Sequence, residues 1–310
     1  MLSALFLSPT AAVAQASPGK HCVPLALILT SSGERQLAGK KVICQGEQLP
    51  ASGNKVSLLC SVTGQVLSLA EIRWRPKRCR ASDLTLIPCA PGSRGQCRRN
   101  RGAEEAKAPT LLTPYGSTLL NRRPAFSWQP VAGATRYFIQ VRSREQGWAT
   151  WVDNASSLSY PADKPALVAG SSYTVSIYAY QGNALREPST TQLSILPNKE
   201  AQQLQELIAQ IKSLNLPKDE EVYLGIDAAY SSRGLMMESV QVLQKRLKEG
   251  SRNPAIYTAL GDRYLQAGFS AKAKTEYETA TTTAEATANQ PELNKAEARL
   301  KLVAQLQNSP

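Results

Sequence analysis

The apolar positions of residues 199–310 recur at the spacing of an amphipathic helix. Leu204, Leu207, Ile211 and Leu214 lie three or four residues apart, and Leu216-Pro217 follows as a stop. Two further helix pairs are predicted downstream of this stop. A last helix starts at Pro291, and Leu293, Ala296, Leu300 and Val303 form its apolar stripe. We therefore expect an α-helical domain over residues 199–310.

The two helix pairs are related by a repeat of 34 residues. Five positions of the second copy match the first, namely Tyr257, Leu260, Tyr264, Gly268 and Tyr277 against Tyr223, Ile226, Tyr230, Gly234 and Leu243. This period is typical of stacked helical hairpins. With Gly261, Ala273 and Ala280, the second copy resembles one full tetratricopeptide repeat, whereas the first copy has Asp227, Ser239 and Arg246 at those three positions.

The tetratricopeptide resemblance implies a concave face that binds an extended peptide or a partner helix. Candidate groove residues are polar positions of the first helix in each pair that packing does not need: Asp227, Ser231, Asp262, Arg263 and Gln266. The alternative is that they are ordinary solvated positions. Two repeats also offer a concave area well below the ~800 Å² per partner of a standard interface.

Residues 110–197 show the alternation of short β-strands. Residues 125–129, 136–143, 173–179 and 192–196 are strand candidates, and shorter strands are expected near Leu119, Thr150 and Leu158. About seven such strands within ninety residues, separated by Pro and Gly, predict a β-sandwich.

Two motifs of this segment resemble the fibronectin type III family. One runs from Trp128 through Pro130 to Tyr137 and Val141, and the other comprises Leu167, Gly170, Tyr173, Val175, Ile177 and Ala179. The resemblance implies a disulfide-free sandwich that serves as a spacer or a binding module. Trp148 and Trp151 lie three residues apart and should face opposite ways in a strand, so packing explains these aromatic residues better than sugar binding does.

Residues 20–101 predict a small β-domain. Residues 24–30 form a continuous apolar run, and residues 41–44, 55–62 and 65–69 are further strand candidates between glycines. The stretch from Gly46 to Leu69 is similar to exported β-domains of the FecR type, which implies a compact fold and no activity. Residues 102–109 are small, polar and end at a proline, which indicates a linker.

All six cysteines lie in this first domain, and they indicate an oxidising compartment. They are Cys22, Cys44, Cys60, Cys79, Cys89 and Cys97; no two are close enough for a zinc site, and fifteen disulfide pairings stay open. Residues 1–16 combine an apolar run with the small-x-small site Ala12-Val13-Ala14, which resembles a signal peptide although no basic residue precedes Leu2. We therefore expect a protein exported to the periplasm or outside the cell, without a transmembrane span in the mature chain.

The net charge of +12 is concentrated at the N-terminal end. Lys and Arg exceed Asp and Glu by 15 − 6 = 9 over residues 15–108, by 7 − 4 = 3 over residues 109–198, and by 14 − 14 = 0 over residues 199–310. Such a basic stretch is a candidate polyanion site, and a solvated loop is the alternative. The candidates are Arg73, Trp74, Arg75, Lys77, Arg78, Arg80, Arg98, Arg99 and Arg101.

These observations predict a multidomain β-plus-α protein that is not an enzyme. The sequence offers one histidine, no phosphate-binding glycine loop and no metal-ligand spacing, so no catalytic set, metal or cofactor is expected. The first hypothesis is an exported scaffold, similar in architecture to exported cyanobacterial proteins, that binds a protein or peptide through its helical repeats. The second is an envelope-binding module that holds an acidic glycan or anionic surface through residues 73–101; export argues against nucleic acid. The expected shape is a rod with the helical bundle at one end and the basic segment at the other.

Overall fold

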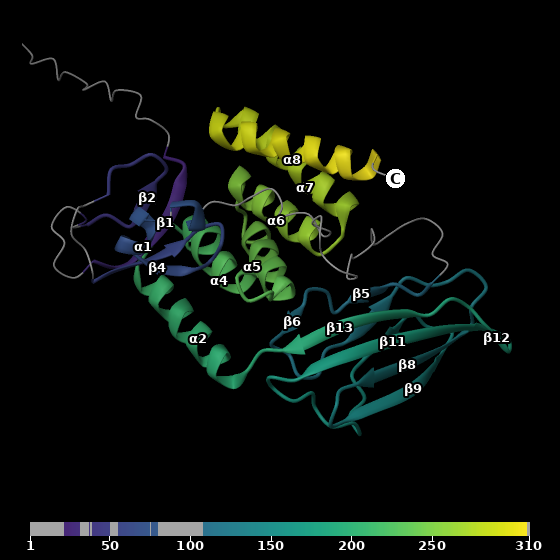
Figure 1. Ribbon diagram of the computed structural model, residues 1–310. Helices are drawn as coiled ribbons and strands as arrows, with labels where there is room; N and C mark the ends of the chain where they lie inside the picture. Colours follow the sequence, from purple (N-terminus) through teal and green to yellow (C-terminus); the bar gives the residue numbers. More distant parts are fainter. Residues whose placement is uncertain are drawn as a thin grey trace, which may run out of the picture.

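The computed structural model describes residues 22–31, 37, 39–49, 55–74, 76–79 and 108–308. Within these residues the chain forms a small β-sheet, a β-sandwich and a set of helices (Figure 1). The expectation of a multidomain β-plus-α protein is confirmed at this level. No helix in the described ranges is both long enough and apolar enough to cross a membrane.

The first sheet is antiparallel with the strand order β2-β1-β3-β4. Its strands are β1 (Pro24–Ser31), β2 (Val42–Cys44), β3 (Val56–Cys60) and β4 (Val66–Ser68), and α1 (Leu69–Trp74) and a 3-10 turn η2 (Pro76–Cys79) follow. All four strands lie where the apolar runs predict them. Disulfides join Cys22 to Cys44 and Cys60 to Cys79, whereas Cys89 and Cys97 lie outside the described residues.

The sandwich consists of two sheets around one core. One has the order β10-β7-β5, and the other has the order β6-β13-β11-β8-β9 with β12 paired to β11. The strands are β5 (Leu111–Thr113), β6 (Thr118–Leu119), β7 (Phe126–Trp128), β8 (Arg136–Arg142), β9 (Gly147–Asp153), β10 (Ser157–Leu158), β11 (Ser172–Gln181), β12 (Ala184–Leu185) and β13 (Ser189–Ile195). Trp148 is buried in the core and Trp151 is 43% exposed on the opposite face, as strand alternation requires.

The helices begin with α2 (Asn198–Ser213) and continue as hairpins. The first hairpin joins α3 (Lys218–Glu220), a π-helical segment η4 (Glu221–Ile226) and α4 (Asp227–Ser231) to α5 (Met236–Lys248). The second joins α6 (Pro254–Gln266) to α7 (Ser270–Ala286), and α8 (Gln290–Asn308) closes the set. Gly234 and Gly268 have φ values of 72° and 85° at the two turns, a conformation that glycine adopts without strain. Gly261 lies against the ring of Tyr277, where an added Cβ would be 2.4 Å from the ring atom Cε1.

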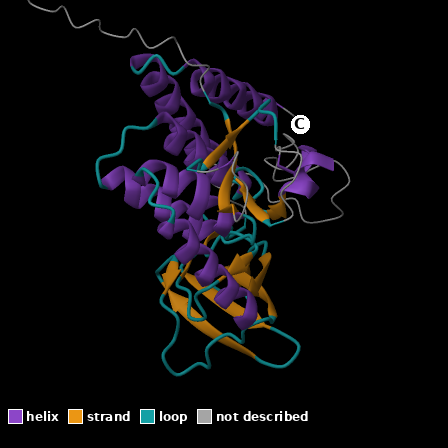
Figure 2. Ribbon diagram, turned by 90° about the vertical axis from the view of Figure 1, so that its left-hand side faces the viewer, coloured by secondary structure: helices purple, strands orange, loops and turns teal. Residues whose placement is uncertain are grey.

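The expected rod is wrong, because the first sheet packs against the helices (Figure 2). Leu25, Ala26 and Ile28 face the core of the N-terminal domain, whereas Leu27 and Leu29 of the same strand join a cluster with α2, η4 and α4. Leu58 and Leu59 of β3 divide between the two cores in the same way. The run of apolar residues at 24–30 therefore has a physical reason: both faces of β1 are buried.

The sandwich also contacts the helices, through the segment that contains β5 and β6. Tyr115 packs edge to face on Phe269 with ring centroids 5.3 Å apart. The backbone N–H of Leu120 donates to Glu238 Oε1 over 3.3 Å, and Glu238 Oε2 is buried without a partner. Burial raises the pKa of Glu238, although hydrogen bonds from its own backbone N–H and that of Leu120 act in the opposite direction.

A methyl group at Gly64 should disturb the contact between the first sheet and the helices. An added Cβ would lie 1.9 Å from the carbonyl oxygen of Ala228, whereas Gly46, which shares a positive φ, has nothing within 4 Å. We expect both Gly64→Ala and Gly46→Ala to lose about 1 kcal/mol from backbone strain, and Gly64→Ala to lose a further ~1–3 kcal/mol from the clash. Urea denaturation measures the difference, and equal losses in the two variants would contradict this packing.

Glu238→Gln should remove part of the pH dependence of stability. Because the pKa of Glu238 in the folded state is raised above its ordinary value of 4.5, folding favours the protonated carboxyl group. The stability that this preference adds is fully present below pH 4.5 and is lost as the pH rises through the raised pKa. We expect Glu238→Gln to be more stable than wild type above the raised pKa and to show a flatter stability profile. Glu285→Gln, at an exposed position of α7, is the matched control and should follow wild type. Thermal unfolding between pH 4 and pH 8 tests this prediction.

Candidate binding cleft

A cleft of about 320 Å³ lies between the first sheet and the helices. We call it the interdomain cleft. Its wall on the sheet side consists of Val23, Pro24, Gln45, Ser61 and Val62. Its wall on the helical side comes from η4, α4, α6 and α8, and consists of Tyr223, Leu224, Asp227, Ala255, Ala259, Asp262, Arg263, Glu292, Lys295 and Arg299. The cleft thus faces the first helix of each hairpin and the helix that follows them.

Both disulfides are next to residues of the cleft wall. Cys22, Cys44 and Cys60 immediately precede Val23, Gln45 and Ser61, respectively. The N–H of Gln45 also donates to the carbonyl oxygen of Val23 over 2.8 Å. The covalent links therefore fix the sheet side of the cleft, which short loops alone would leave more mobile.

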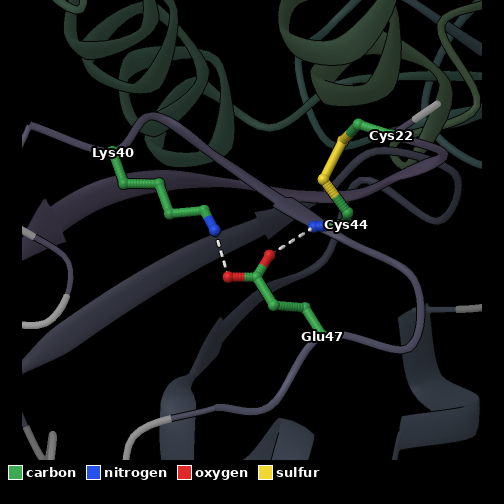
Figure 3. The surroundings of a disulfide bond; sticks show 4 residues. All are labelled: Cys22, Lys40, Cys44 and Glu47. Atoms are coloured by element: carbon green, nitrogen blue, oxygen red, sulfur yellow. Dashed lines mark hydrogen bonds and ion pairs between the residues drawn. A yellow bond between two sulfur atoms is a disulfide. The ribbon is translucent and has the colours of Figure 1, made fainter. Parts of the chain in front are cut away.

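Lys40 and Glu47 reinforce the first disulfide (Figure 3). Glu47 pairs with Lys40 through one carboxylate oxygen and accepts the N–H of Cys44 at 3.0 Å through the other. Burial by itself would raise the pKa of Glu47, but the hydrogen bonds from Lys40 and Cys44 outweigh it and lower the pKa. The charged carboxylate thereby holds the loop that carries Gln45.

Three of the five groove candidates lie in the interdomain cleft, and two of these form a buried ion pair. Arg263 donates to Asp227 through Nε at 2.9 Å and Nη2 at 2.7 Å, with both side chains at least nine-tenths buried. Burial alone would lower the pKa of Arg263, but the Asp227 carboxylate outweighs it and raises the pKa. The pair joins the two hairpins, because Asp227 belongs to α4 and Arg263 to α6.

The other candidates also have partners within the chain. Asp262, the third candidate in the cleft, accepts the hydroxyl of Tyr277 at 2.8 Å and Arg299 Nε at 3.1 Å. Gln266 Oε1 accepts from Arg263 Nη1 at 2.8 Å, and the hydroxyl of Ser231 donates to the carbonyl oxygen of Ala228 at 3.2 Å. The groove candidates were polar positions that packing was expected not to need. This expectation is wrong for Asp227, Asp262 and Arg263, because all three bind side chains of other elements.

Two residues of the cleft that carry buried, unpartnered oxygen atoms were not among the candidates predicted from the sequence. Ser61 Oγ and Glu292 Oε2 are buried and have no hydrogen-bond partner. Glu292 Oε1 lies 3.5 Å from Lys295 Nζ, a loose contact to a side chain that is 42% exposed. The repeat pattern contained no signal for them, because Ser61 lies in the first domain and Glu292 follows the second repeat.

The polyanion candidates fall largely outside the described residues. Arg73 and Arg78 are exposed, and Arg78 lies 3.6 Å from Glu71. The side chains of Trp74 and Lys77 are outside the described set, as are Arg75, Arg80, Arg98, Arg99 and Arg101. Polyanion binding by this region stays a prediction.

Known proteins resemble parts of the chain. No family model matches it, and no curated protein matches it. A crystal structure of PcrH from Pseudomonas aeruginosa is 20% identical over 34% of this chain and 83% of its own, with a TM-score of 0.29. The fn3 domain of human collagen alpha-1(XX) chain is 21% identical over 31% of this chain and 94% of its own, with a TM-score of 0.23.

Removing the Asp227 carboxylate should strongly destabilise the helical domain. Asp227→Ala leaves the Arg263 charge buried without its partner, and we expect a loss of about 3–5 kcal/mol in the free energy of unfolding. Glu278→Ala is the matched control, because Glu278 pairs with Lys274 at the surface over 3.7 Å and should lose less than about 1 kcal/mol. Urea denaturation followed by circular dichroism compares them. Similar losses in the two variants would contradict the structural role of the pair.

Proposed function

We propose that this protein is a non-catalytic, exported adaptor that binds a protein or peptide partner in the interdomain cleft. In this proposal the helical hairpins are tetratricopeptide-like and supply the binding face, and the sandwich is a fibronectin type III-like spacer. The observation that carries it is the cleft itself. It opens on the first helices of the hairpins, combines apolar and charged residues, and retains unused hydrogen-bonding atoms.

Export is supported by the disulfides. Cys22–Cys44 and Cys60–Cys79 require an oxidising compartment to persist, which agrees with the signal-peptide-like start of the chain. The role of the disulfides beside the cleft is also consistent with binding there, because a rigid wall loses less conformational entropy when a partner binds.

A substitution that fills the cleft tests the proposal. Ala259 is half-buried in the cleft wall on α6, whereas Ala271 is exposed on α7 outside the cleft. We expect partners cross-linked to the exported wild-type protein to be lost in Ala259→Trp and retained in Ala271→Trp. Quantitative mass spectrometry of the cross-linked partners, with circular dichroism to verify folding, provides the measurement. Partners that remain bound to folded Ala259→Trp would contradict the proposal.

A further inference from the structure

Two buried oxygen atoms of the interdomain cleft have no hydrogen-bond partner. Ser61 is 8% exposed and its hydroxyl is unpartnered, and Glu292 Oε2 is buried and unpartnered on the facing wall. A buried carboxylate oxygen without a donor is costly, because its hydration has been removed without replacement. A ligand that donates hydrogen bonds would remove that cost.

The remaining charged groups of the cleft indicate whether a ligand would be an anion or a cation. Asp227 is held by Arg263, and Asp262 is held by Arg299 and Tyr277, so these acids and their guanidinium partners are already engaged. An anionic ligand would have to compete with those carboxylates for the guanidinium groups. A cation would instead pair with Glu292 Oε2, which is buried and has no hydrogen-bond partner, whereas Lys295 Nζ lies 3.5 Å from the other oxygen, Oε1.

The shape and lining of the cleft further restrict the ligand. Val23 and Val62 are each 40% exposed, and both line the cleft, as does Ala259 on the helical side. They offer apolar contact to an aliphatic chain. The volume of about 320 Å³ is at the lower end of ligand pockets, which suits one long side chain better than a folded segment.

We infer that the interdomain cleft binds a primary ammonium group on an aliphatic stem, such as a lysine side chain presented by a partner protein. The ammonium has three N–H donors, and in this proposal one donates to Glu292 Oε2 and another to Ser61 Oγ. The stem lies along Val23 and Val62, as lysine methylenes commonly cover apolar surface. This inference rests on the proposed function and adds the chemistry that the partner must present.

The test is an NMR titration of the full-length oxidised protein with defined probes. The first probe is the capped peptide acetyl-Gly-Lys-Gly-amide, and its comparison is the same peptide with Nε-acetyl-lysine. We expect amide shifts at Ser61, Ala259 and Glu292 with the first peptide and none with the second, since acetylation removes the charge. 1,5-Diaminopentane distinguishes the source: tighter binding of this diamine than of the peptide would overturn the assignment to a partner's lysine.

Variants separate the proposed contact from general effects. Glu292→Gln keeps the shape but loses the charge, so affinity for the lysine peptide should fall by about tenfold to a hundredfold. Ser61→Ala should weaken binding by a smaller factor, and Glu297→Gln, exposed on the same helix, should bind like wild type. No binding of the lysine peptide to wild type, or equal binding to Glu292→Gln, would overturn the inference.

The two proposals can fail separately. If Ala259→Trp abolishes partner cross-linking while the lysine peptide does not bind wild type, the cleft binds a partner through other chemistry and only this inference fails. If the lysine peptide binds in the cleft while folded Ala259→Trp keeps its cross-linked partners, those partners bind elsewhere and the adaptor proposal fails.

Discussion

The packing of the first β-sheet on the helices is the interaction on which the rest of the structure depends. Leu27, Leu29 and Leu59 leave the core of their own domain and join the cluster that α2 and η4 build around Ile211. Burial of three such side chains contributes roughly 5–9 kcal/mol before the entropy of ordering is subtracted. Without this contact the cleft would have one wall, and neither disulfide would lie beside it.

Charged side chains of the helical domain join its elements. Asp227 occupies the repeat position that Gly261 occupies in the second hairpin, where a Cβ would meet the Tyr277 ring. The first hairpin has the smaller Leu243 in place of Tyr277, which is compatible with a side chain at position 227. The carboxylate then joins the hairpins through Arg263. Asp227, at which the first repeat differs from the second, thus links the two neighbouring hairpins through its ion pair with Arg263.

The sequence predicted the secondary-structure elements better than it predicted the residues of the cleft. The strand at 136–143 and the turn at Gly268 were predictable, because alternation and a positive φ are local requirements that leave a signature in residue types. The groove candidates were selected by position along the repeat. Because side-chain pairing acts across elements, that selection took in the buried ion pair and missed Glu292.

The sequence by itself determined most of the elements, their order and the division of the chain into β and α parts, since periodicity depends on neighbours along the chain; the short elements β5, β12 and α1 were not predicted. It also placed the cysteines in the first domain. Only the tertiary structure decided that Leu27 and Leu29 face the helices, that Cys22 pairs with Cys44, and that Ser61 and Glu292 line one cleft. These contacts join residues up to hundreds of positions apart, and their energies depend on burial and distance, which no local pattern encodes.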